Sequence, residues 1–217
     1  MSIQQFANQF VCDLVAYEPG KPIEETAREL GLDPETIVKL ASNENPLGPS
    51  PKAVEALKIH NDDLHLYPDG DSKKLKSLIA KHESLDVSNI IIGNGSNEVL
   101  ELAARAFLNK DTSALMSKHA FAVYKIVTQS NGSKIIEVPT IDWRHALNDF
   151  SNYIEDSTRV CFVANPNNPT GTYNSHDEFK SMMDSIPSSI LVILDLAYFE
   201  YVTEQDYVRV NELLEKY

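Results

Sequence analysis

The chain has 217 residues, of which 42% are hydrophobic, so it can bury a globular core. Its 32 acidic and 19 basic side chains give a formal net charge of −13. This acidic balance disfavours nucleic acid and anionic membrane surfaces as partners, because both attract basic proteins.

Cysteine usage and the N-terminus favour a cytoplasmic location. Cys12 and Cys161 are isolated and make no disulfide framework. Residues 1–5 show neither the basic start nor the apolar stretch of a signal peptide, and no run approaches the roughly 18 apolar residues of a membrane span. The histidines make no metal-ligand spacing, and we expect them on the surface or at helix ends: His60, His65, His82, His119, His145 and His176.

Residues 1–40 are expected to form an arm and a short helix. Residues 17–22 contain two prolines, and because the residue before a proline avoids the helical region, this stretch should be extended. Residues 23–30 predict a helix that ends at Gly31. A loop rich in Asn, Pro, Gly and Ser follows over residues 40–51.

From residue 51 onward, predicted helices and strands alternate. Hydrophobic periodicity predicts helices over 51–59, 71–82, 96–108, 122–130 and 175–186, and strands over 89–93, 113–116, 134–138, 159–164 and 190–194. Strands separated by helices of this length indicate βαβ units and a parallel sheet.

Two polar clusters directly follow predicted strands. Asn165–Gly171 reads Asn-Pro-Asn-Asn-Pro-Thr-Gly, and Asp195–Tyr198 reads Asp-Leu-Ala-Tyr. Open α/β sheets bind ligands at the carboxyl ends of their strands. The amide of Asn168, the carboxylate of Asp195 and the phenol of Tyr198 together suit a heteroaromatic cofactor with a ring nitrogen and a phenolic oxygen. Alone, the first cluster can equally be a turn, and Asp195 a satisfied structural carboxylate.

A glycine-containing turn, Gly93-Asn-Gly-Ser-Asn-Glu98, joins a predicted strand to a predicted helix. The N–H groups of Ser96, Asn97 and Glu98 would open that helix and could hold a phosphate at its positive end. The turn has no Gly-Lys-Ser/Thr and is not a Walker loop. Most such turns only connect elements, so this motif by itself leaves both interpretations open.

Taken together, these motifs resemble those of fold-type I pyridoxal-phosphate (PLP) aminotransferases, and within them the histidinol-phosphate aminotransferase family. The similarity runs along essentially the whole chain in seven stretches: Tyr17–Pro22, Leu40–Ser50, Tyr67–Gly70, Gly93–Glu98, Ala120–Tyr124, Asn165–Gly171 and Asp195–Tyr198. The resemblance implies an α/β fold in which helices flank a mixed, mostly parallel sheet. Residues 1–45 would form an N-terminal arm and a small-domain segment, and residues 46–217 the N-terminal part of a PLP-binding large domain.

The resemblance also implies roles around the PLP ring. Asp195 would pair with the pyridine nitrogen, so that the ring acts as an electron sink. Asn168 and Tyr198 would hydrogen-bond the ring 3-oxygen, and Phe121 would stack on the ring face. The phosphate would be held by the backbone N–H groups of Ser96, Asn97 and Glu98.

Residues nearer the N-terminus would act at the rim of the site. By resemblance, Tyr67 reaches the phosphate of the neighbouring subunit's cofactor, which implies a homodimer. Tyr17 and the stretch from Asn43 to Asn45 would line the substrate mouth.

The implied reaction transfers an amino group between L-histidinol phosphate and 2-oxoglutarate in histidine biosynthesis, by a ping-pong scheme. Three alternatives stay open at this point. The chain could be a sibling aminotransferase or phosphothreonine decarboxylase, a non-catalytic remnant, or an unrelated nucleotide-binding α/β domain.

The chain departs from the family pattern in two places. Leu196 replaces an acidic residue, and because successive strand residues face opposite ways, we expect it to affect packing or the dimer contact rather than chemistry. The family's Schiff-base lysine follows the Asp-x-Ala-Tyr element, whereas this chain ends at Tyr217. Lys118, Lys125 and Lys216 are not expected to replace it. The chain alone is therefore expected to be inactive, and its fold incomplete, with the strand over 89–93 lacking its neighbour.

Overall fold

The computed structural model describes residues 3–17, 20–59, 62 and 64–217, and His60 lies outside these residues. The chain divides into two compact units. One comprises Met1–Ala16 together with Gly93–Tyr217, and the other comprises Tyr17–Ile92. No helix in the described part of the chain is long and apolar enough to cross a bilayer.

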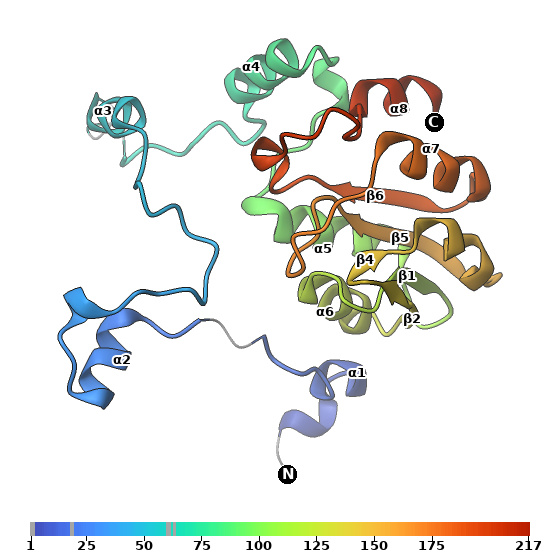
Figure 1. The fold of residues 1–217 in the computed structure, drawn as a ribbon, viewed down its shortest axis with the longest axis horizontal. Helices are drawn as coiled ribbons and strands as arrows, with labels where there is room; N and C mark the ends of the chain where they lie inside the picture. The colour runs from blue at the N-terminus through green and yellow to red at the C-terminus, as the bar shows by residue number, and fades with distance from the viewer. Residues whose placement is uncertain (1–2, 18–19, 60–61, 63) are drawn as a thin grey trace. The chain divides into compact units, whose positions relative to one another are not determined.

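The first unit is built on a four-stranded parallel sheet with the order β2-β1-β5-β6 (Figure 1). Its strands are β1 (Ser113–Ser117), β2 (Lys134–Val138), β5 (Thr158–Ala164) and β6 (Leu191–Asp195). Each pair is parallel, as predicted, with registers such as Leu115↔Ile136 and Phe162↔Ile193. The sequence predicted the four strands within a residue or two, but it did not predict their order.

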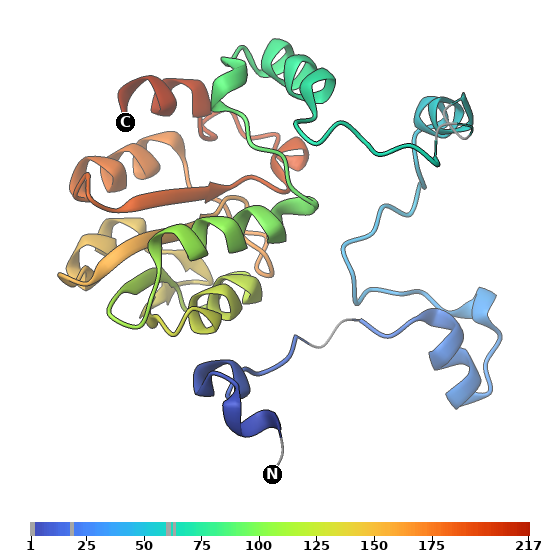
Figure 2. The same ribbon diagram turned by 180° about the vertical axis from the view of Figure 1, so that it is seen from behind.

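Helices cover both faces of this sheet (Figures 1 and 2). Ala114 and Met116 of β1 pack in one apolar cluster with α5 and α6, whereas Leu115 packs in the opposite cluster with η5, α7 and α8. The alternation follows from strand geometry, which points successive side chains to opposite faces. These helices are α5 (Gly95–Phe107), α6 (Ala122–Ser130), η5 (Leu147–Tyr153), α7 (His176–Ser185) and α8 (Val210–Lys216).

Shorter elements complete the first unit. A two-stranded antiparallel hairpin, β3 (Thr140–Ile141) and β4 (Arg144–His145), leads from β2 to η5. Its turn residues Asp142 and Trp143 have φ of 49° and 66°, and positive φ at both positions is what a type I′ hairpin turn requires. The remaining elements are η1 (Ile3–Phe6), α1 (Gln9–Cys12), which contacts α6, and η6 (Phe199–Tyr201).

The second unit is helical and contains α2 (Ile23–Leu30), η2 (Pro34–Thr36), α3 (Pro51–Ile59), α4 (Lys73–Glu83) and η4 (Val87–Asn89). Helix α2 ends at Gly31, whose φ of 66° is the left-handed cap that the sequence predicted. On α4, the expected apolar face is not buried, since Leu75 and Leu78 are about half exposed. Only Ala27 and Ala80 are buried hydrophobic residues among the described residues of this unit.

The predicted strand over 89–93 is wrong. Residues 90–92 form no strand or helix, and Ile91 is largely exposed. A strand is stable only when a neighbour pairs with its backbone N–H and C=O groups, and none of the described strands pairs with this segment. An apolar run alone therefore does not make a strand here.

Candidate active site

The two polar clusters singled out in the sequence lie at neighbouring strand ends. Ala164, the last residue of β5, is in register with Asp195, the last residue of β6. The N–H of Asn165 donates to the carbonyl oxygen of Asp195 at 2.9 Å. The expectation that both clusters share the C-terminal edge of one parallel sheet is confirmed.

The Asp195 carboxylate is half-buried and held by two donors. The Tyr124 hydroxyl donates to Oδ2 at 2.8 Å, and the N–H of Ala197 donates to Oδ1 at 3.1 Å. Together, the two donors fix the orientation of the carboxylate group. Burial, and then the charge of Asp195, raise the pKa of Tyr124 far above its ordinary value of 10.0, so this phenol stays a hydrogen-bond donor.

Tyr124 is fixed by aromatic neighbours beneath the sheet edge. It is fully buried in α6 and stacks on Phe162 of β5, with ring centroids 4.9 Å apart and an interplanar angle of 9°. Phe121, at the N-cap of α6, meets Tyr124 edge-on at 5.7 Å. These contacts hold the hydroxyl in line with the end of β6.

The Asn165–Gly171 loop is folded back on itself at this edge. Asn167 N–H donates to the Thr172 carbonyl, and Gly171 N–H donates to the Asn167 carbonyl, both at 2.8 Å. The Asn167 side chain reaches the carbonyl of His119 at 2.7 Å. That contact ties the loop carrying Asn168, which is half-buried, to the segment that leads into Phe121.

Helix α5 presents its N-terminus towards the same edge. A short connection, residues 108–112, leads from the end of α5 to the start of β1, so α5 runs opposite to the strands and begins near their C-terminal ends. Gly95, with φ of 74°, makes the left-handed turn into the helix. Ser96 and Asn97 are exposed, and first-turn N–H groups such as theirs have no acceptor within a helix. The Glu98 carboxylate instead accepts from Asn94 N–H at 2.6 Å.

Comparison with known proteins decides the family. A protein-family model described as aminotransferase class I and II matches residues 35–217. The chain belongs to this aminotransferase family. This membership excludes the alternative of an unrelated nucleotide-binding α/β domain, which the sequence motifs had left open.

Curated relatives and solved structures agree with this assignment. A histidinol-phosphate aminotransferase from Akkermansia muciniphila is 50% identical over 93% of this chain and 56% of its own length. One from Pseudomonas fluorescens is 50% identical over 90% of this chain and 53% of its own length. The chain therefore spans about half the length of the curated relatives it matches. A histidinol-phosphate aminotransferase from Sinorhizobium meliloti, solved in complex with pyridoxal-5'-phosphate, matches with a TM-score of 0.80 and 23% identity, over 93% of this chain and 54% of its own.

The predicted site residues of this aminotransferase chain are divided between its two units. Seven lie in the first unit, along the sheet edge, in α5 or beside α6: Ser96, Asn97, Glu98, Phe121, Asn168, Asp195 and Tyr198. The other four, Tyr17, Asn43, Asn45 and Tyr67, belong to the second unit, and all four are exposed. Asn45 caps its own loop, accepting from Leu47 N–H at 3.0 Å.

Sequence reasoning missed Tyr124 as a residue of the site. Its motif, Ala120–Tyr124, was identified, but its place on the apolar face of a helix gave no reason to separate it from core residues. Its partner Asp195 lies 71 residues further along the chain. Leu196, in contrast, packs against the apolar cluster that contains Val163 and Phe179, as its expected packing role requires.

One histidine corrects the sequence prediction that all six lie on the surface or at helix ends. His145, in the hairpin strand β4, is only 4% exposed, whereas His176, which is 5% exposed, does lie at a helix end. The His145 ring lies 2.6 Å from the Ser117 hydroxyl and 2.8 Å from the Ala164 carbonyl. Burial lowers the pKa of His145 below 6.5. His176 begins α7, and its Nδ1 accepts from Arg209 N–H at 3.2 Å.

The three lysines considered as replacements for the family's Schiff-base lysine form ion pairs with other residues or are exposed. Lys125 pairs with Glu137 at 2.6 Å, and Lys216 pairs with Asp184 at 2.5 Å. Lys118 is exposed.

Proposed function

We propose that this aminotransferase chain binds PLP at the edge formed by β5, β6 and α5, and that the whole protein exchanges an amino group between L-histidinol phosphate and 2-oxoglutarate. Histidinol phosphate is inferred from the names of relatives that are 50% identical over at least 90% of the chain, and 2-oxoglutarate from the family resemblance of the sequence motifs. Residues 46–217 would supply the N-terminal part of the cofactor-binding domain, and residues 1–45 an arm and a small-domain segment.

The hydrogen bond from buried Tyr124 to Asp195 carries the cofactor proposal. A carboxylate fixed by one O–H and one N–H donor keeps a free lone pair on each oxygen. It also lies at a partly exposed strand end, where a protonated pyridine nitrogen can reach it. The donor set therefore fits the ring of PLP.

The other roles follow from placement around this carboxylate. Phe121, edge-on to Tyr124, would cover one face of the ring. Asn168 and Tyr198, both half-buried, would hold the ring 3-oxygen. The first-turn N–H groups of Ser96, Asn97 and Glu98 would bind the phosphate with the help of the helix dipole.

PLP supplies the electron sink for the carbanion formed at the substrate. The protein's task is electrostatic and positional. Asp195, whose orientation Tyr124 fixes, would hold a proton on the ring nitrogen. Asn168 and Tyr198 would hold the ring in place through hydrogen bonds to its 3-oxygen. Phe121 would shield one face of the ring from water.

The substrate and assembly roles belong to the second unit. Tyr17, Asn43 and Asn45 would line the mouth through which the amino donor enters. Tyr67, whose side chain is fully exposed, would reach the phosphate of a neighbouring subunit's cofactor in a cytoplasmic homodimer.

Cofactor titration of the purified 217-residue chain tests the binding proposal. Absorbance and quenching of protein fluorescence should report saturable binding of one PLP per chain. A chain that takes up no PLP contradicts the proposal.

The substrate is tested with the protein made from the gene's complete reading frame. L-histidinol phosphate and 2-oxoglutarate should yield glutamate, whereas O-phosphothreonine should yield no CO₂. Decarboxylation of O-phosphothreonine would assign the sibling activity. A reading frame that stops at Tyr217 and yields PLP binding without turnover would identify a non-catalytic remnant.

A further inference from the structure

The side chain of Asn165 closes the loop that follows β5. Its Oδ1 accepts from the N–H of Asn174 at 2.8 Å, and its Nδ2 donates to the carbonyl of Asn174 at 3.0 Å. Both residues are buried, with exposed fractions of 0% and 1%. The two ends of the loop are therefore joined by a pair of hydrogen bonds shielded from water, and Asn168 lies between them.

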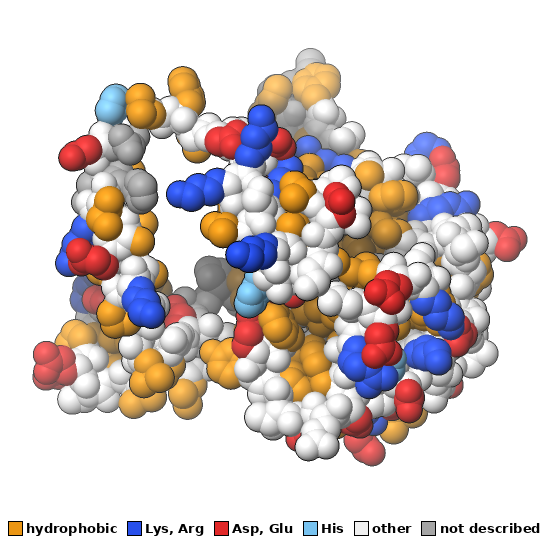
Figure 3. Space-filling model, turned by 90° about the horizontal axis from the view of Figure 1, so that it is seen from above, with side chains coloured by type: hydrophobic (Ala, Val, Ile, Leu, Met, Phe, Trp, Pro, Cys, Tyr) orange, Lys and Arg blue, Asp and Glu red, His pale blue; other side chains and the backbone are white. Residues whose placement is uncertain are grey.

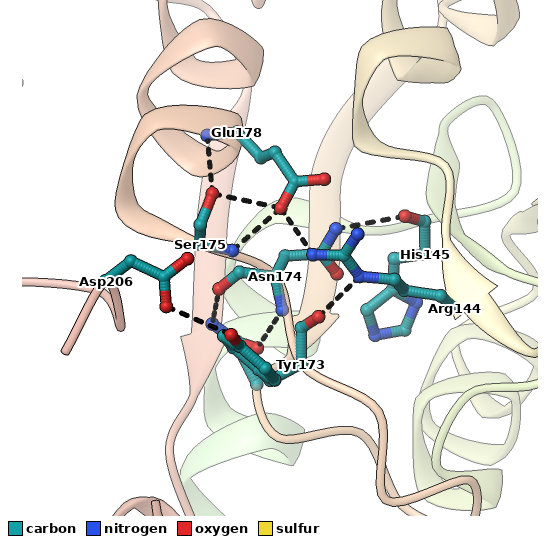
Figure 4. Close-up of polar contacts among 8 residues, drawn as sticks. Arg144, His145, Tyr173, Asn174, Ser175, Glu178 and Asp206 are labelled. Atoms are coloured by element: carbon teal, nitrogen blue, oxygen red, sulfur yellow. Dashed lines mark hydrogen bonds and ion pairs between the residues drawn. The ribbon is translucent and has the colours of Figure 1, made fainter. Parts of the chain in front are cut away.

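This closure is anchored to the strand ends through His145. Asn174 Nδ2 donates to the His145 carbonyl at 3.1 Å (Figure 4). Because a carbonyl can only accept, the His145 nitrogen that lies 2.8 Å from the Ala164 carbonyl, Nε2, carries a proton. Nδ1 then accepts from the Ser117 hydroxyl at 2.6 Å. His145 thus joins the ends of β1 and β5 through its buried imidazole, and its backbone carbonyl binds the closed loop.

Further contacts hold the same loop from both sides. Arg144 donates to the Tyr173 carbonyl and to the Glu178 carboxylate, each at 2.6 Å (Figure 4). The Tyr207 hydroxyl donates to the Asn165 carbonyl. Glu178 and Ser175 form the capping box that starts α7. The position of the loop is therefore fixed by the hairpin, by α7 and by the segment before α8.

We infer that Asn165, Asn174 and His145 form a clasp that positions Asn168 for the ring oxygen of the cofactor. The inference rests on the proposed PLP site. Asn168 would contact the ring oxygen from a loop, and a loop side chain binds a ligand in one geometry only when neighbouring groups fix its position. The clasp residues are positioning residues, because they act on the ring through Asn168.

A double-mutant cycle separates positioning from general stability. Asn165→Asp keeps the shape and the Oδ1 acceptor but removes the donor to the Asn174 carbonyl. It should weaken PLP binding about tenfold, the equivalent of about 1.4 kcal/mol. In an Asn168→Ala background it should have no further effect, because the clasp then has no side chain to position.

A milder variant keeps the test valid if Asn165→Asp fails to fold. Asn174 Oδ1 has no hydrogen-bond partner among the described residues, so Asn174→Ala removes only the bond to the His145 carbonyl. It should weaken PLP binding about threefold in the original background, as loss of one neutral hydrogen bond does, and not at all with Asn168→Ala. Tyr173→Phe is the matched control, since it removes only the exposed bond to Asp206, and it should leave PLP affinity unchanged.

Amide hydrogen exchange of the cofactor-free chain tests the clasp without PLP. Asn165→Asp should speed exchange at Asn167 and Gly171, whose N–H groups close the loop, and should leave Met182 of α7 unchanged. Unchanged exchange in the loop overturns the inference, as does equal weakening of PLP binding in both backgrounds. A wild-type chain that binds no PLP overturns the proposed function, and this inference with it.

Discussion

At the scale of single residues, the site is organised by the pair Tyr124–Asp195. The aromatic contacts of Tyr124 lie inside the core, and only its hydroxyl reaches the sheet edge, where it meets a partly exposed carboxylate. A buried phenol has little conformational freedom left, so it holds its acceptor in one orientation. Core packing around Tyr124 therefore fixes the orientation of the carboxylate that would meet the cofactor.

Replacement of this charge should cost more than replacement of the amide. Asp195→Asn keeps the shape but loses the charged partner of the ring nitrogen, so PLP affinity should fall by about 1.5–3 kcal/mol. Asn168→Ala loses a neutral hydrogen bond and should cost about 1 kcal/mol. Fluorescence titration of both variants measures the difference. Equal small losses would show that Asp195 does not face the ring nitrogen.

The same phenol should make the fold sensitive to alkaline pH. Burial raises the pKa of Tyr124 above its ordinary 10.0 and the pKa of Tyr207 to about 12. The folded state therefore keeps protons that the unfolded state loses above pH 10, and the free energy of unfolding must fall as pH rises past that value.

Urea unfolding followed by circular dichroism between pH 8 and pH 11 measures this slope. Tyr124→Phe keeps the stacking on Phe162 and removes the titrating group, so the decline above pH 10 should become shallower. Tyr201→Phe is the control, because Tyr201 is largely exposed. An identical slope in Tyr124→Phe and the parent chain would contradict the assignment.

At the scale of elements, local patterns predicted most helices and strands because their faces are buried by near neighbours. Helix α2 and its cap at Gly31, strand β2 and helix α6 formed over the predicted residues. Residues 90–92 did not, since strand formation depends on a pairing partner that local sequence cannot supply. The strand order and the hydrogen bond from Tyr124 to Asp195 join segments that are distant in sequence. Local patterns therefore could not predict them.

The same distinction separates predicted from missed site residues. Asn168 and Asp195 are recognisable because polar residues directly follow apolar strands. His145 gave no such signal, because its ring is satisfied by Ser117 and Ala164, which lie in strands distant in sequence. Local sequence alone therefore predicts His145 as a surface residue, and only the packing of the hairpin against β1 and β5 shows that it is buried.

Leu196, directly after strand β6, offers a test of whether stability and PLP binding can be changed separately. Leu196 follows Asp195 but contacts the apolar cluster on the other side. Leu196→Glu, which restores the acidic residue typical of the family, should lower the free energy of unfolding by about 1–2 kcal/mol through lost apolar burial. PLP affinity should stay unchanged. A large loss of PLP affinity at unchanged stability would place Leu196 in the binding site.

At the scale of the whole molecule, the two units differ in how they are stabilised. The first unit contains both apolar clusters, with α-helices on either face of the sheet. In the second, the large apolar side chains that the structure describes are mostly exposed, among them Leu40, Leu47, Leu64 and Tyr67. Figure 3 shows hydrophobic side chains open on the molecular surface. Strand β6 also lies at an edge of the sheet, where it pairs only with β5 among the described strands.

This contrast predicts that the chain will not unfold as one cooperative body. Burial of apolar area is the main favourable term in folding, and the second unit buries only alanines among its described hydrophobic residues. Limited proteolysis should therefore cut within residues 17–92 well before it cuts within 113–195. Hydrogen exchange should follow the same order, and warming should expose apolar surface and favour aggregation.

Mass spectrometry of the early proteolytic fragments locates the cuts, and PLP serves as the control. The cofactor binds the first unit in our proposal, so it should slow cleavage within 113–195 by mass action on the folded state. It should leave the early cuts unchanged unless a second copy of the chain covers residues 17–92. A soluble monomer with one sharp thermal transition, and equal protection of both units, would show that the second unit has a stabilising contact that its exposed side chains do not reveal.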